Sequence, residues 1–150
     1  MAARIAIASD HAAVALKAVL AAWLRELGHA VTDLGPETNA SVDYPDYGFA
    51  LGDAIAQHRA DMGIALCGSG IGISIAVNRN PAARCALVSE PLSAALARRH
   101  NDANVIALGA RLTGEDMAKA CVQAFINTAF EGGRHQGRVA KLAHLAQEPV

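Results

Sequence analysis

Residues 62–72 read Met-Gly-Ile-Ala-Leu-Cys-Gly-Ser-Gly-Ile-Gly, an apolar run that ends in a cysteine and a glycine-rich turn. An apolar run of this length, bounded by glycines, is typical of a buried strand. The turn after it would place the Cys67 thiol beside several free backbone N–H groups, a setting suited to holding an oxyanion or a phosphate near a base. The segment therefore predicts chemistry on a small anionic substrate.

Strand and helix patterns alternate along the rest of the chain. Strands are predicted at 4–9, 30–34, 61–66, 84–88 and 104–108. Helices are predicted at 16–27, 47–59, 73–77, 91–99, 113–130 and 134–146, with a capping box of Thr113 and Asp116 at the start of the fifth. Short apolar strands joined by helices indicate an α/β fold: a three-layer Rossmann-like sandwich whose parallel sheet has about five strands and helices on both faces.

In such a sheet, ligands bind beyond the carboxyl ends of the strands where the strand order reverses. For a sheet that begins with the order 2-1-3, this position lies between the first and third strands. Those strands end at Asp10-His11 and at Cys67-Gly68, so two polar clusters should converge on one crevice.

Length and composition narrow the class of protein. The 150 residues fit a single domain, 1–150, and 53% hydrophobic residues with only 4% aromatic ones suit close-packed helices over a buried sheet. A net charge of −1 and the absence of a long apolar run predict neither a nucleic-acid nor a membrane partner. No signal-peptide pattern opens the chain and its three cysteines are odd in number, so we expect reduced thiols in the cytoplasm.

Other interpretations of the glycine loop fit less well. Gly68 and Gly70 with Glu90 resemble part of a dinucleotide fingerprint, but Ile73 stands at the third glycine position and the loop follows the third strand. A Walker loop would need Gly-Lys-Ser/Thr, and a cysteine phosphatase loop would need arginine where Ile73 stands. The Cys67 environment favours a thiolate that can accept a proton, whereas Cys85 and Cys121 are predicted core residues.

Three further clusters each have a structural and a functional interpretation. Asp10 either caps the first helix or serves the crevice with His11. His100 and Asn101 precede the fifth strand, at the amino edge opposite the crevice, so any role there requires another subunit. Arg134 and Arg138, four residues apart, form either a solvated basic face or a phosphate clamp. No group of His, Asp and Glu has metal-ligand spacing, so no metal and no cofactor are expected.

Taken in order, these motifs resemble the type B ribose-5-phosphate isomerases, a family that includes allose- and galactose-6-phosphate isomerases. The resemblance extends over essentially the whole chain. It rests on Ser9-Asp10-His11-Ala12, Asp43-Tyr44-Pro45, the run from Cys67 to Ala76, Asn78, Arg84, Ser89-Glu90-Pro91, His100-Asn101-Asp102-Ala103-Asn104, Gly109-Ala110-Arg111 and Gly132-Gly133-Arg134-His135.

The resemblance implies metal-free interconversion of an aldose phosphate and a ketose phosphate through a cis-enediolate. Cys67 would move the proton between C2 and C1, and Ser69 would relay a proton or orient the sugar. His100, aided by Asp10, would open the sugar ring. The remaining implied contacts are the loop N–H groups of Gly68, Gly70, Ile71, Gly72, Ile73 and Ser74 for the enediolate oxygen, Asn101 and Tyr44 for sugar hydroxyls, and His11, Arg134, Arg138 and Arg111 for phosphate.

The family's active sites lie between subunits, so the resemblance also implies a homodimer or tetramer in which the C-terminal helix packs on a partner. Ribose 5-phosphate is the expected substrate. Allose 6-phosphate, galactose 6-phosphate or a four-carbon sugar phosphate is the alternative, because pocket depth decides chain length. A nicotinamide-dependent reductase and a non-catalytic sugar-phosphate sensor remain the competing classes.

Overall fold

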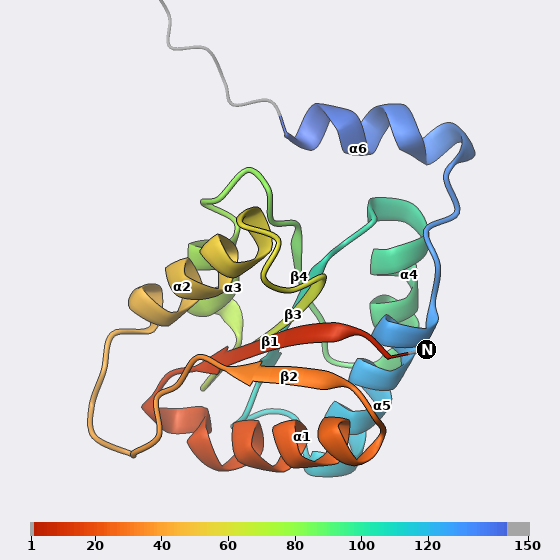
Figure 1. Cartoon of the computed structure of the whole chain (residues 1–150). Coiled ribbons are helices and arrows are strands. Elements are labelled where there is room, and N and C mark those ends of the chain that lie inside the picture. Colours follow the sequence, from red (N-terminus) through yellow and green to blue (C-terminus); the bar gives the residue numbers. More distant parts are fainter. Residues whose placement is uncertain (1, 144–150) are drawn as a thin grey trace, which may run out of the picture.

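The computed structural model describes residues 2–143, and its centre is a five-stranded parallel sheet (Figure 1). The strand order is β2-β1-β3-β5-β4. The strands are β1 (Arg4–Ser9), β2 (Ala30–Asp33), β3 (Met62–Cys67), β4 (Cys85–Leu87) and β5 (Val105–Gly109). The predicted parallel sheet and its 2-1-3 beginning are confirmed, and β5 additionally inserts between β3 and β4.

Helices cover both faces of this sheet. They are α1 (Val14–Glu26), α2 (Tyr44–Ala56), α3 (Ile71–Val77), α4 (Pro91–Asn101), α5 (Glu115–Asn127) and α6 (Gln136–Leu142), with 3-10 turns η1 (His11–Ala13) and η2 (Gly133–His135). Buried residues of α1, α4 and α5 pack on one face, and those of α2 and α3 on the other. The three-layer α/β sandwich is therefore as predicted.

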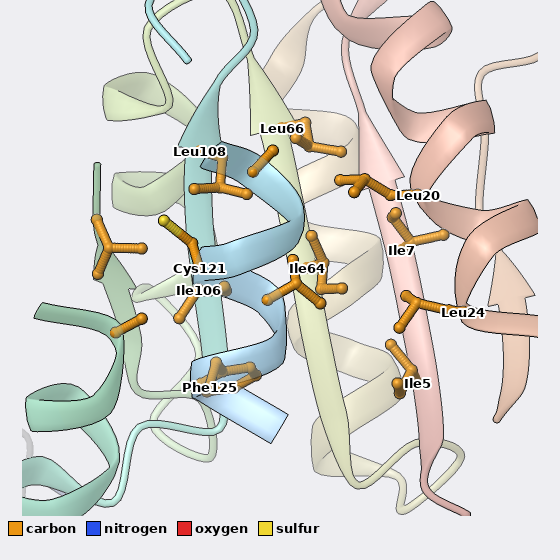
Figure 2. Close-up of a cluster of buried hydrophobic side chains, with 14 of the residues drawn as sticks. Ile5, Ile7, Leu20, Leu24, Ile64, Leu66, Ile106, Leu108, Cys121 and Phe125 are labelled. Atoms are coloured by element: carbon orange, nitrogen blue, oxygen red, sulfur yellow. The ribbon is translucent and has the colours of Figure 1, made fainter. Parts of the chain in front are cut away.

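The two faces of the sheet differ in side-chain size because residues of a strand point alternately to opposite sides. Ile5, Ile7, Ile64 and Leu66 join α1 and α5 in one core cluster, which includes Phe125 (Figure 2). The opposite face carries the smaller Ala6, Ala8 and Ala65, together with Cys67. The last residue of β3 thus points its thiol toward the layer formed by α2 and α3.

Several helix boundaries differ from the prediction. The helix expected at 47–59 begins at Tyr44, because Pro45 is tolerated in the first turn, and a positive φ at His58 follows its end. The helix expected at 113–130 spans only Glu115–Asn127. The predicted capping box at its start is wrong: Gly114 is the N-cap without a side-chain hydrogen bond, and Thr113 belongs to the preceding turn, where its N–H donates to Gly109 O.

The C-terminal helix α6 lies apart from the sheet and its covering helices (Figure 1). None of its residues is buried. The prediction of one helix over 134–146 is replaced by η2 followed by α6, and residues 144–146 lie outside the described residues. Within residues 2–143, no helix combines the length and apolarity needed to cross a membrane.

Candidate active site

Cys67 lies at the carboxyl end of β3 and is 5% exposed. Its Sγ accepts a hydrogen bond from the N–H of Gly70 at 3.1 Å, so the glycine loop curls back over the sulfur. The thiol also lines a cavity of about 280 Å³ at this edge of the sheet. The residues around that cavity are Asp10, Tyr44, Cys67, Gly68, Ser69, Gly72, Arg111 and Leu112.

Gly70 makes this curl possible. Its φ is +78°, and a Cβ at this position would lie 2.8 Å from the carbonyl carbon of Leu108 and 2.7 Å from Cδ1 of Leu87. Both the left-handed backbone and the close approach to β5 therefore require glycine. A side chain here would displace the N–H group that holds the Cys67 sulfur.

The side chains of Tyr44 and Arg111 pack against the same loop. A Cβ at Gly72 would lie 2.6 Å from Cζ of Tyr44, and one at Gly68 would lie 3.3 Å from Cζ of Arg111. The phenol comes from the start of α2 and the guanidinium follows β5. Both side chains thus lie directly on the glycine loop, within reach of a ligand placed above it.

The backbone N–H groups of the loop divide into two sets. Gly70 donates to Sγ of Cys67, Ile71 donates to Oγ of Ser69 at 3.2 Å, and Ser74 donates to Gly70 O. Gly72 and Ile73 belong to the first turn of α3, where N–H groups have no intrahelical acceptor. Gly72 borders the Cys67 cavity, so its N–H can donate to the negative oxygen of a ligand without breaking a bond inside the loop, whereas Ile73 is fully buried.

The side chains of the loop differ from its backbone in what they offer. Ile73 is buried in the core, and Ser74 Oγ donates to Ile71 O at 2.6 Å. Ile71 is exposed and lines a neighbouring hollow with Ser69 and Leu112. Ser69 is the loop residue whose hydroxyl borders the Cys67 cavity.

Asp10 and His11 follow β1 beside this cavity. Asp10 Oδ1 accepts from the N–H of Ala12 at 2.9 Å, so it caps η1, and the residue also lines the Cys67 cavity. His11 Nδ1 accepts from the N–H of Val42 at 3.1 Å, which leaves the proton on Nε2. The two interpretations of Asp10 are therefore compatible, and His11 has one ring nitrogen available as a donor.

The other predicted site residues lie elsewhere. Because α4 starts after β4 and runs back against the strand direction, its end lies at the amino edge of the sheet. A hollow of about 290 Å³ there is lined by His100, Asn101, His135, Arg138, Val139 and Leu142. The His100 and His135 rings stack with centroids 4.5 Å apart, and Arg134 Nε lies 3.4 Å from Nε2 of His135.

Comparison with known proteins agrees with this arrangement. The sequence profile of the family described as "Ribose/Galactose Isomerase" matches residues 5–142. The chain belongs to the ribose/galactose isomerase family.

Relatives of this family are similar over nearly their whole length. Ribose-5-phosphate isomerase B of Escherichia coli is 42% identical, with 96% of this chain and 97% of the relative covered. The solved ribose-5-phosphate isomerase of Thermotoga maritima has a TM-score of 0.92 at 46% identity, covering 94% and 97% of the two chains. The Clostridium thermocellum ribose-5-phosphate isomerase B has a TM-score of 0.91 at 43% identity, covering 93% and 94%.

In this member of the ribose/galactose isomerase family, the fold adds two residues that the sequence did not single out for a role. His135 lies between Arg134 and Arg138 in the sequence, is buried, and stacks on His100. Burial, and then the positive charge of His100 and Arg134, lowers the pKa of His135. Its place between Arg134 and Arg138 was the available signal.

Glu131 is the second added residue, and it lies close to two histidines. Donor atoms of His100, Glu131 and His135 lie within 4.8 Å of one another. These three residues come together in space although their spacing along the sequence does not indicate a metal site. Tertiary packing brings the end of α4 against the segment after α5, which sequence spacing does not reveal.

The two other thiols of this isomerase-family chain have a different environment. Burial raises the pKa of Cys85 to about 12 and also raises that of Cys121, where the charge of Glu90 adds to the effect. Both groups therefore stay protonated near neutral pH. Cys121 belongs to the core cluster of α5, and Cys85 packs against the opposite cluster.

Proposed function

We propose that this chain interconverts ribose 5-phosphate and ribulose 5-phosphate. The observation that carries the proposal is the Cys67 sulfur, held by the Gly70 N–H and open to a cavity roofed by Tyr44 and Arg111. A proton acceptor beside unsatisfied N–H groups suits an aldose–ketose isomerisation, because that reaction needs a base and a site for a transient oxyanion.

The proposed chemistry is a proton transfer with no net oxidation of the sugar. Cys67, as a thiolate, takes the proton from C2 of the open-chain aldose, the C–H electrons form a C1–C2 double bond, and the carbonyl oxygen on C1 becomes an enediolate oxygen. The N–H group of Gly72 holds that oxygen, at roughly 3 kcal/mol for a well-placed donor. Cys67 then returns its proton to C1, while Ser69 relays the O2 proton to the negative O1, so that O2 becomes the ketose carbonyl and O1 a hydroxyl.

Ring opening and substrate binding need the remaining residues. His100, aided by Asp10, is proposed to take the proton of the anomeric hydroxyl and deliver it to the ring oxygen as the ring C–O bond breaks, and Tyr44 and Asn101 to hold sugar hydroxyls. The phosphate is assigned to Arg134 and Arg138, with further contacts from His11 and Arg111. This assignment joins residues from both edges of the sheet, since Asp10 lines the Cys67 cavity and His100 lies at the end of α4.

The separation of these two clusters supports an active site shared between two copies of the chain. β3 has six residues, so the sheet edges are about 20 Å apart, and a pentose phosphate is much shorter than that distance. The Cys67 cavity, at about 280 Å³, is also at the small end for a ligand site. We propose a homodimer or a tetramer in which α6 packs on the partner.

A mixing experiment tests the shared site. Cys67→Ala and His100→Ala homodimers should each be inactive, because each lacks one half of every site. When the two variants are unfolded together and refolded, mixed dimers should contain one intact site and restore about a quarter of the wild-type activity. If mixtures that form mixed dimers stay inactive, the two residues do not serve the same site across an interface.

The clamp is tested by Arg134→Ala. Loss of a charge-assisted hydrogen bond to phosphate should raise KM for ribose 5-phosphate roughly tenfold to a hundredfold, with a smaller effect on kcat. Steady-state kinetics measures the two constants. Arg59→Ala is the control, since Arg59 is exposed and, among residues 2–143, its side chain makes one hydrogen bond, from Nε to Gln57. An unchanged KM in Arg134→Ala would rule out the clamp.

Direct assay of the purified chain tests the function itself. Aldose phosphates of four, five and six carbons are compared, and the highest kcat/KM is expected for ribose 5-phosphate. A preference for allose 6-phosphate or galactose 6-phosphate would keep the reaction and change the substrate. Tight sugar-phosphate binding without turnover would indicate a sensor, and nicotinamide-dependent turnover would indicate a reductase.

The proposal treats residues 1–150 as one sugar-phosphate isomerase domain that acts in the cytoplasm. Cys67, Cys85 and Cys121 are free thiols in the structure, and reduced thiols suit a reducing compartment. No nucleic-acid or membrane partner is part of the proposed function.

A further inference from the structure

Three side chains with metal-binding atoms meet at the amino edge of the sheet. His100 comes from the last turn of α4, Glu131 from the segment after α5, and His135 from η2. One donor atom of each lies within 4.8 Å of the other two. The two imidazole rings are stacked at an interplanar angle of 17°, and both residues line the same hollow.

The backbone holds these three residues in place. The N–H of Glu131 donates to Arg99 O at 3.1 Å, which ties Glu131 to the helical turn that carries His100. The N–H of His135 donates to Gly132 O at 3.0 Å and closes the turn between the other two ligands. Because the backbone is fixed, only side-chain rotations are needed to bring the donor atoms to the separations of a coordination sphere.

The position of the His135 ring suits a metal ligand. A metal binds an imidazole through the free electron pair of a ring nitrogen. Nε2 of His135 faces Nε of Arg134 at 3.4 Å, so its electron pair already points toward a cationic group. Arg134 is exposed and its contact is long, so a cation can replace it.

We propose that His100, Glu131 and His135 form a binding site for a divalent transition metal, with Zn²⁺ as the best fit. Two imidazoles and one carboxylate are a donor set that Zn²⁺ takes in four-coordinate sites, with water in the fourth position. Ca²⁺ and Mg²⁺ prefer oxygen ligands and are excluded by this donor set. Arg134 and Arg138 lie beside the site, and their charge keeps the binding reversible.

Metal binding has a consequence that rests on the proposed function. A metal on His100 removes the electron pair that ring opening requires, and it displaces Arg134 from its position beside His135. Zn²⁺ should therefore inhibit isomerisation reversibly, and a chelator should restore it. The metal acts here as an inhibitor and takes no part in the proton transfer.

Binding is tested separately from activity. The full chain, treated with chelator and dialysed into phosphate-free buffer, is titrated with Co²⁺ while its visible absorption is followed, and with Zn²⁺ in a calorimeter. One equivalent per chain is expected. Glu131→Gln and His135→Asn should each weaken binding roughly tenfold or more, because each removes one ligand.

Two controls separate this site from other metal-binding groups. Glu26→Gln removes a carboxylate from the exposed end of α1, and Cys67→Ala removes the cavity thiol. Both should bind Co²⁺ and Zn²⁺ as the wild type does. Loss of binding in Cys67→Ala, or unchanged binding in both Glu131→Gln and His135→Asn, would overturn the assignment.

The inhibitory consequence is read from the ratio of rates with and without Zn²⁺ in each variant. The rate with Zn²⁺ divided by the rate without it should fall well below one in the wild type and in Glu26→Gln. The same ratio should fall much less in Glu131→Gln. One-to-one binding without inhibition would overturn this consequence and leave the metal site standing. If the chain turns over no sugar phosphate at all, the proposed function fails, and the titrations still decide the metal site.

Discussion

Replacing Cys67 with alanine is expected to lower kcat for ribose 5-phosphate by about a thousandfold or more, because it removes the proposed base. Substrate binding should change little, since the thiol makes no phosphate contact in the proposed site. Steady-state assays measure the loss of turnover. Calorimetric titration of the inactive variant with ribose 5-phosphate measures the retained binding.

A matched variant distinguishes lost chemistry from lost packing. Cys85→Ala removes another thiol from the sheet, one whose pKa of about 12 keeps it protonated, and it should retain near-normal kcat. Cys67→Ala should also unfold near the wild-type temperature, because the change removes one sulfur atom from the edge of the core. Turnover near the wild-type level in Cys67→Ala would end the assignment of Cys67 as base.

Replacing Asp33 with asparagine is expected to destabilise the fold by about 3 kcal/mol, a large effect for one exchanged atom. Both oxygens of Asp33 accept from Nζ of Lys17 at 2.7 Å, and Lys17 is only 2% exposed while Asp33 is 29% exposed. Asparagine keeps the size of the side chain and an acceptor for the Gly35 N–H, but leaves a buried ammonium without its counter-charge. Chemical denaturation measures the change.

Two comparison variants make this expectation specific to the buried charge. Lys17→Met should cost less than Asp33→Asn, because the carboxylate it leaves unpaired is partly solvated. Asp61→Asn breaks the Arg4–Asp61 pair, in which both side chains are 54% exposed, and should cost less than about 1 kcal/mol. Equal losses in Asp33→Asn and Asp61→Asn would show that burial does not govern the Lys17–Asp33 pair.

The Lys17–Asp33 pair also bears on the site. Asp33 accepts from the N–H of Gly35, and Gly35 O accepts from the N–H of Ser9 at the end of β1. Further along the same loop, the N–H of Val42 donates to Nδ1 of His11. These hydrogen bonds join the ends of β1 and β2 beside the Cys67 cavity. The local sequence around Lys17 does not indicate that Asp33 is its partner.

Local patterns predicted the architecture well because they report on burial and backbone preference. The apolar run before Cys67 predicted β3, and the alternation of short strands and helices predicted a parallel sheet with a crevice between β1 and β3. Boundaries were less predictable: the helix expected from residue 47 begins at Tyr44, because Pro45 fits the first turn of α2. Thr113 resembles a cap, yet its backbone is held in the turn after β5.

The sequence by itself determined the parallel α/β fold and the placement of Cys67 beside a glycine loop, but it assigned Arg134 and Arg138 to one helix that the structure divides into η2 and α6. Tertiary structure alone decided that the Gly70 N–H holds the sulfur, that Tyr44 and Arg111 close over the loop, and that His135 and Glu131 join His100. The physical reason is range: strand and turn preferences act between neighbours, whereas these contacts depend on how separate elements pack.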